Sequence, residues 1–142
     1  MKESDSMFKM VQSRLGYTDG EMELFSSDPR NVEVLMKAPE LRNKTIVAEV
    51  VESHGCNSRH RIGDKFHLDS AGNLISALCP EKMCVYAVSA LKHVVFAMGE
   101  MLLTGVDPNR IRFRRTGCCD VGLECGGWGR VVIEVRMEDR KK

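Results

Sequence analysis

The sequence predicts an α+β fold, with a small antiparallel or mixed sheet of about four strands covered by one long helix and an N-terminal helical extension. Three observations predict this fold class: helical patterns in residues 1–43, strand patterns in residues 44–138, and one long helical pattern among those strands. Residues 139–142 form a short basic tail. The chain has 142 residues, which is the length of one ordinary domain with a short appendage.

The N-terminal extension contains two predicted helices. Apolar residues at four-residue spacing predict the first over residues 5–16. Residues 18–20 have the composition of a turn. Asp28 followed by Pro29 predicts the start of the second helix, because a side-chain oxygen caps the first turn and proline suits the first helical position. Pro39 ends it.

Four segments have the composition of β-strands: residues 44–52, 64–69, 111–116 and 130–138. The first is apolar on both faces, which is typical of a central strand. The others alternate between apolar and polar residues, which is typical of strands with one buried face. A further short strand is predicted over residues 74–77.

The covering helix is predicted to open at Cys79-Pro80, because proline suits the first helical position. A wide apolar stripe then runs as far as Met98, and Gly99 or Gly105 ends the helix. A stripe of this width predicts that the helix packs across the sheet.

The charge balance excludes some classes of function. Lys and Arg number 21, Asp and Glu number 20, and the net charge is +1. This balance argues against a dedicated nucleic-acid-binding domain, which is normally basic. No uncharged apolar stretch approaches the roughly 20 residues that span a membrane, and the N-terminus does not read as a secretory signal. We therefore expect a cytoplasmic protein with reduced cysteines.

Six cysteines are the most informative feature of the sequence. Those at the ends of predicted elements, where distant segments converge, are Cys56, Cys79 and the pair Cys118 and Cys119. Soft thiolate ligands brought together by a fold are typical of zinc and iron–sulfur sites. We therefore predict a composite metal site of Cys56, Cys79 and either Cys118 or Cys119. The candidates for its fourth ligand are His54, His60 and Cys125.

Other interpretations remain open. Cys79 is predicted at the N-terminal end of a helix, where the dipole stabilises a thiolate, so it is also a candidate nucleophile. Arginines near the cysteine loop are either a solvated strand face or an anion site, and Arg112 and Arg114 with Trp128 are the candidates for binding a ligand. Cysteine also packs as a small hydrophobe, and Cys84 is interpreted in this way.

The order of motifs resembles a family of small prokaryotic cysteine-containing proteins of about ninety residues and unknown activity. The matching motifs cover roughly residues 45–138: His54-Gly55-Cys56, Ile62-Gly63-Asp64-Lys65-Phe66, Cys79-Pro80, Gly117-Cys118-Cys119-Asp120 and a closing strand. The resemblance implies a compact α+β fold. It also implies a shared cysteine set at Cys56, Cys79 and Cys119, with Cys118 as the alternative. It transfers no activity.

The leading hypothesis is a metal-binding accessory protein or subunit of a larger redox enzyme, holding zinc or an iron–sulfur cluster. Its N-terminal helices would bind a protein partner or form a homo-oligomer. The second hypothesis is a small enzyme that uses the Cys79 thiolate on an anionic small molecule. The third is a structural or interaction domain in which the cysteines only fill the core.

Overall fold

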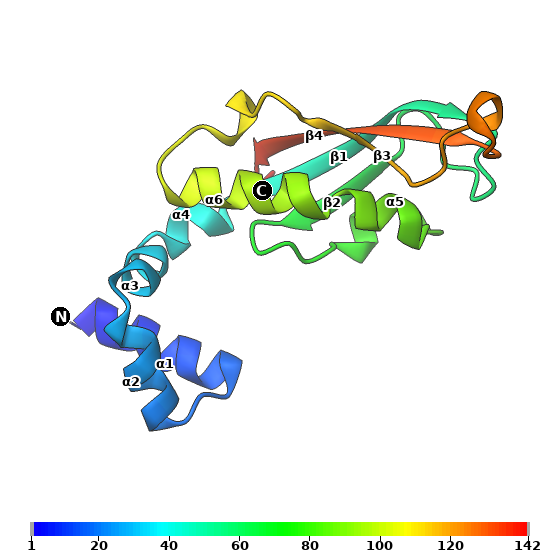
Figure 1. Ribbon diagram of the computed structural model, residues 1–142. Coiled ribbons are helices and arrows are strands. Elements are labelled where there is room, and N and C mark those ends of the chain that lie inside the picture. The colour runs from blue at the N-terminus through cyan, green and yellow to red at the C-terminus, as the bar shows by residue number, and fades with distance from the viewer. Residues whose placement is uncertain (1, 142) are drawn as a thin grey trace. The chain divides into compact units, whose positions relative to one another are not determined.

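The computed structural model describes residues 2–141, and the exposure of side chains from residue 4 onward. It is an α+β protein with a four-stranded antiparallel sheet (Figure 1). The chain divides into two compact units, Met1–Glu40 and Leu41–Lys142. The first unit is helical, and the second contains the sheet and all six cysteines.

The helical unit contains α1 (Lys2–Leu15), α2 (Asp19–Ser27) and α3 (Pro29–Met36). The short helix α4 (Ala38–Arg42) spans the division between the units. Helix α3 begins as predicted, with the Asp28 carboxylate accepting a hydrogen bond from the N–H of Arg30 at 2.9 Å.

The predicted turn at residues 18–20 is wrong, because helix α2 begins there. The Thr18 hydroxyl accepts a hydrogen bond from the N–H of Glu21, and the Glu21 carboxylate accepts one from the N–H of Thr18. This reciprocal capping box pairs two N–H groups that the first turn of a helix otherwise leaves free.

The sheet has the strand order β2-β1-β4-β3. Strand β1 (Lys44–His54) lies between β2 (Lys65–Asp69) and β4 (Arg130–Asp139) and is central, as its composition predicts. Edge strand β3 (Arg115–Gly117) is shorter than the predicted strand over residues 111–116. The predicted strand over residues 74–77 is a single bridge at Leu74 followed by a 3₁₀ turn, η1 (Ser76–Leu78).

Two helices replace the single long helix predicted from the apolar stripe. Helix α5 (Val85–Ala90) and helix α6 (Lys92–Leu103) are separated at Leu91, and neither begins at Cys79. Cys79 is instead in an extended conformation after η1, as expected for a residue before proline. The short 3₁₀ turns η2 (Pro108–Arg110) and η3 (Leu123–Cys125) follow later in the chain.

One face of the sheet carries the core. Alternate residues of β1, β2 and β4 pack there against α5 and α6, with Phe66, Met98 and Ile133 all fully buried. The other face carries cross-strand ion pairs: Lys65 with Glu49, Arg136 with Glu49, and Arg115 with Glu134. Opposite charges on neighbouring strands are a common stabilising pattern on a solvated sheet face. Within residues 2–141 no helix combines the length and the apolar character needed to span a bilayer.

Candidate functional site

Four of the six cysteines line one small pocket of about 190 Å³ at one end of the sheet. We call it the thiol pocket, and its cysteines are Cys56, Cys84, Cys118 and Cys119. They come from three segments: the turn after β1, the start of α5 and the loop after β3, which meet at the same end of the sheet (Figure 1). All six cysteines of the chain are free of disulfides.

The turn that carries Cys56 is held by close contact between two backbone segments. Gly55 has a left-handed backbone (φ +65°), and a Cβ at Gly55 would lie 2.7 Å from the carbonyl oxygen of Trp128. A Cβ at Gly129 would overlap the carbonyl group of Gly55 and lie 2.9 Å from the backbone nitrogen of Cys56. Only glycine fits at these two positions, so the two chain segments touch backbone to backbone.

The loop between β3 and β4 is organised around the Asp120 carboxylate. Its Oδ1 accepts hydrogen bonds from the N–H groups of Gly122 (3.1 Å) and Trp128 (3.0 Å), and its Oδ2 accepts one from the N–H of Gly129 (2.8 Å). These hydrogen bonds lower the pKa of Asp120, with the largest contribution from the N–H of Gly129, followed by that of Gly122. Desolvation acts to raise this pKa, and the N–H of Trp128 lowers it further.

Cys84 stands at the N-cap of helix α5, half-buried. Desolvation acts to raise the pKa of its thiol. The N–H groups of Ala87 and Tyr86 and the hydroxyl of Ser58 outweigh that effect, so the pKa of Cys84 is lowered. The direction follows from N–H and O–H dipoles that point toward the sulfur at a helix start.

His60 is a buried wall of the thiol pocket, with 3% of its surface exposed. Its Nε2 accepts a hydrogen bond from the N–H of Cys84 at 3.3 Å, which assigns the proton of the neutral ring to Nδ1. That Nδ1 faces the Asp64 carboxylate at 3.8 Å, and the ring packs edge-on against Phe66. His60 therefore connects the β1–β2 loop to the backbone of Cys84.

Cys79 is not among the residues that line the thiol pocket. Its sulfur accepts a hydrogen bond from the N–H of His67 at 3.3 Å, on the edge strand β2, and its half-buried side chain packs against the core. The structure therefore does not bring Cys79 together with Cys56 and Cys118. No helix follows Cys79 directly, so the helix-dipole argument for its thiolate does not hold.

The remaining predicted ligands are divided. His60 lines the thiol pocket, whereas His54 and Cys125 do not. His54 is exposed at the end of β1 and pairs in register with Arg130, and Cys125 is exposed in η3. Among residues 2–141 no three His, Cys, Asp or Glu side chains are already arranged to hold a metal ion.

The predicted ligand-binding residues also lie outside the thiol pocket. Arg112 stacks on the ring of Phe113, with its guanidinium carbon 4.3 Å from the ring centre. Arg114 approaches Glu134 at 3.8 Å. Trp128 has 78% of its surface exposed, so it presents an indole to solvent.

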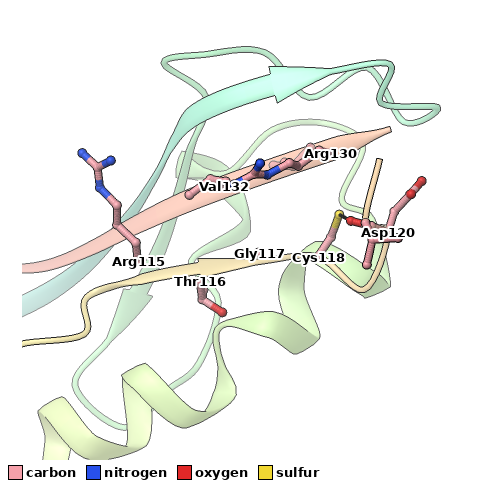
Figure 2. Close-up of a pocket in the computed structure, with 9 residues that line it drawn as sticks. Arg115, Thr116, Gly117, Cys118, Asp120, Arg130 and Val132 are labelled. Atoms are coloured by element: carbon pink, nitrogen blue, oxygen red, sulfur yellow. Dashed lines mark hydrogen bonds between the residues drawn. The ribbon is translucent and has the colours of Figure 1, made fainter. Parts of the chain in front are cut away.

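A second, more open pocket of about 410 Å³ adjoins the first along strands β3 and β4 (Figure 2). The two pockets share Cys118, Asp120, Arg130 and Val131. Figure 2 shows the Cys118 sulfur turned toward Asp120, whose backbone carbonyl it approaches at 3.8 Å. Cys118 therefore forms part of the wall between the two pockets.

Sequence reasoning missed two residues of the site, Cys84 and Asp120. The apolar stripe of the covering helices includes Ala87, Leu91 and Met98, which are all buried. The buried positions of these helices therefore begin three residues after Cys84, and this is the signal that could have placed a helix start there. No comparable periodic signal marks Asp120, because its hydrogen bonds depend on the fold of the loop.

Comparisons of the chain with models of protein families, with curated proteins and with solved structures found no match.

Proposed function

We propose that this protein is a small metal-binding module in which Cys56, Cys84 and Cys118 supply thiolate ligands to one soft metal ion. One observation carries the proposal: three half-buried cysteines from three separate segments line the same small pocket. This ligand set differs from the one predicted from the sequence, since Cys84 takes the place of Cys79.

The donor chemistry supports the proposal. Thiolates select soft or borderline ions such as zinc, and structural zinc sites use four Cys or His ligands. The exposed Cys119 lines the same pocket and is the natural fourth ligand. His60 is less suited to that role, because its Nε2 already accepts the N–H of Cys84.

The pocket is not arranged for coordination in advance, as no group of three candidate side chains within residues 2–141 is in place for a metal. A cysteine has one side-chain torsion, and its staggered rotamers point the sulfur in different directions. We therefore propose that binding turns the three thiols toward the centre of the pocket. Four donors suit a single zinc ion, and an iron–sulfur cluster is the other outcome that the experiment can detect.

The surface around the pocket supports the proposal of an accessory role. Tyr86 and Trp128 are 62% and 78% exposed, and exposed aromatic side chains near a site are typical of surfaces that bind other proteins. Exposed apolar residues of the helical unit, including Leu15, Leu24 and Met36, support the proposal that those helices bind a partner or a second copy. We expect the protein to work in the cytoplasm, where thiols remain reduced.

The test is metal analysis of protein purified without oxygen, together with its absorption spectrum. We expect about one zinc ion per chain, lost on substitution of Cys56, Cys84 or Cys118 by serine. Cys79→Ser and Cys125→Ser are matched controls from the same chain and should retain the metal. Iron with visible absorption would instead indicate a cluster. Wild-type protein that folds normally and binds neither zinc nor iron would refute the proposal.

The competing function is a thiol enzyme acting on an anionic small molecule. Cys79, the nucleophile predicted from the sequence, is not followed directly by a helix. The specific observation in favour of an enzyme is that Arg130, whose guanidinium is of the type that binds carboxylates and phosphates, lines the same pocket as Cys84. Iodoacetate, an anionic alkylating reagent, separates the two functions. An enzyme predicts fast alkylation of Cys84 alone that zinc does not prevent, whereas the metal site predicts that zinc protects Cys56, Cys84 and Cys118 together.

A further inference from the structure

We infer that Asp120 is the positioning residue of the thiol pocket: its carboxylate folds the loop after β3 so that Cys118 lines the same pocket as Cys56. The inference concerns a residue that is not itself proposed as a ligand. Its consequence for metal affinity rests on the proposed function, whereas its consequence for the distance between the two thiols does not.

The first step is the hydrogen bonding of Asp120. Both carboxylate oxygens are used, Oδ1 by the N–H groups of Gly122 and Trp128 and Oδ2 by that of Gly129. One side chain near the start of the loop thus holds backbone groups near its end. The loop closes on itself, with Cys118 two residues before the carboxylate.

The second step is the contact between this loop and the turn of Cys56. The segment that Asp120 holds at Trp128 and Gly129 is the one that packs against the backbone of Gly55 and Cys56. The carboxylate is therefore connected to both cysteines, to Cys118 along the chain and to Cys56 across the backbone contact. Gly127 leaves room for it, because a Cβ there would overlap Oδ1 of Asp120.

Asp120→Asn tests the inference with little change in size. An amide has one acceptor oxygen, so an NH₂ group must face at least one of the three N–H donors. Asp69→Asn is the matched control. Both backbone donors to Asp69, the N–H groups of Ala71 and Asn73, meet the same oxygen, which an amide can supply. The Asn73 side-chain amide donates to the other oxygen at 3.0 Å and can turn its own oxygen toward the new NH₂ group.

The first measurement is zinc affinity, by competition with a coloured chelator, and the absorption spectrum of the cobalt-loaded protein. Groups that orient metal ligands typically contribute about 10–100-fold to affinity. We expect Asp120→Asn to weaken zinc binding by about that factor and to change the cobalt spectrum, because the thiolate geometry changes. Asp69→Asn should do neither. Equal affinity and equal spectra for the two variants would overturn the inference.

The second measurement uses metal-free protein and separates this inference from the proposed function. Dibromobimane links two neighbouring thiols as each thiolate displaces one bromide, and peptide mass identifies the linked pair. We expect Cys56 to link to Cys118 in the wild type and in Asp69→Asn, with a lower yield in Asp120→Asn. A wild type that links these thiols but binds no metal would refute the metal function alone. Unchanged linking in Asp120→Asn would refute the role of Asp120.

Gly127→Ala keeps the test decisive where Asp120→Asn fails to fold. The added methyl group displaces the Asp120 carboxylate without removing it, since the severe overlap is with Oδ1 of that side chain. Its contacts with the backbone nitrogen and oxygen of Gly122, at 3.0 and 3.1 Å, are tight and ask for only a small shift of the same loop. We expect the same direction of change in affinity and in linking. In the double variant the two effects should be smaller than their sum, because both act on one cluster. Fully additive effects would contradict the inference.

Discussion

Gly129→Ala is the sharpest test of how the two cysteine-bearing loops are held together. Gly129 has no left-handed backbone, so alanine brings no conformational strain of its own. Its cost is steric. The new Cβ would lie less than 3.0 Å from three backbone atoms, namely the carbonyl carbon and oxygen of Gly55 and the nitrogen of Cys56. Non-bonded contacts of a Cβ atom shorter than 3.0 Å essentially never occur in proteins.

The size of the effect follows from which atoms overlap. Overpacking in a well-packed site typically costs about 1–3 kcal/mol, and less where a flexible side chain can turn away. Here all three neighbours belong to the backbone of a turn next to the central strand β1. We therefore expect a loss near the upper end, about 3 kcal/mol. With a urea slope of about 1–3 kcal/mol per M, the unfolding midpoint should fall by about 1 M or more.

The assay is urea unfolding followed by the fluorescence of Trp128, the single tryptophan, and by circular dichroism. Gly99→Ala is the matched control. Gly99 lies within helix α6 with no atom within 4 Å of an added Cβ, so alanine should stabilise the protein by about 0.5–1 kcal/mol. A Gly129→Ala midpoint equal to that of the wild type, with the same slope, would show that the two loops are not in backbone contact.

Three other predictions use the same unfolding measurement. Gly55 and Gly105 both have left-handed backbones, which cost alanine about 1–2 kcal/mol. Only at Gly55 would the added Cβ also meet a carbonyl group of the facing loop, so Gly55→Ala should unfold at a lower urea concentration than Gly105→Ala. Equal unfolding midpoints would refute this prediction. Met98 is fully buried, so Met98→Ala should cost about 2–5 kcal/mol, and a loss below about 1 kcal/mol would contradict the core packing. The pKa of Glu134 is lowered, most of all by the hydrogen bond from Arg115, so the ionised carboxylate stabilises the fold at pH values above the ordinary carboxyl pKa, and this contribution is lost as the pH falls. Glu134→Gln should remove that part of the pH dependence of stability, and plots of stability against pH that match the wild type would argue against it.

The strands were predictable because their patterns are local. Alternation in residues 64–69 and 130–138 corresponds to β2 and β4, and the two-sided apolar run from residue 44 corresponds to the central β1. The predicted strand over residues 111–116 is mostly irregular, because only residues 115–117 pair with β4. Alternation shows that a segment suits a sheet, but pairing depends on what lies beside it.

The start of α2 was obscured by two overlapping signals. Residues 18–20 have turn composition, yet Thr18 followed three residues later by Glu21 is also the pattern of a capping box. In the structure the capping box forms, because it pairs two N–H groups at once.

The cysteines of the thiol pocket were predicted only in part, because the start of helix α5 was misplaced. Placing the helix start at Cys79 made that residue a ligand and left Cys84 in the core. The residue before a proline is biased toward extended conformations. Cys79 is extended, and its sulfur accepts a hydrogen bond from the N–H of His67 in the edge strand β2. Helix α5 therefore begins at Val85, six residues after Cys79, and its N-cap is Cys84.

The convergence of the cysteines has a different physical origin from the periodic patterns of strands and helices. Cys56 and Cys118 line one pocket, and we attribute this to the backbone contact that Gly55 and Gly129 permit and to the Asp120 hydrogen bonds that hold the loop after β3. Each of these requirements is a single residue without periodicity, and each acts between segments far apart in the chain. Substitutions at Gly129 and Asp120 should therefore lower the yield of linking between Cys56 and Cys118, while substitutions at Cys79 should leave the pocket intact.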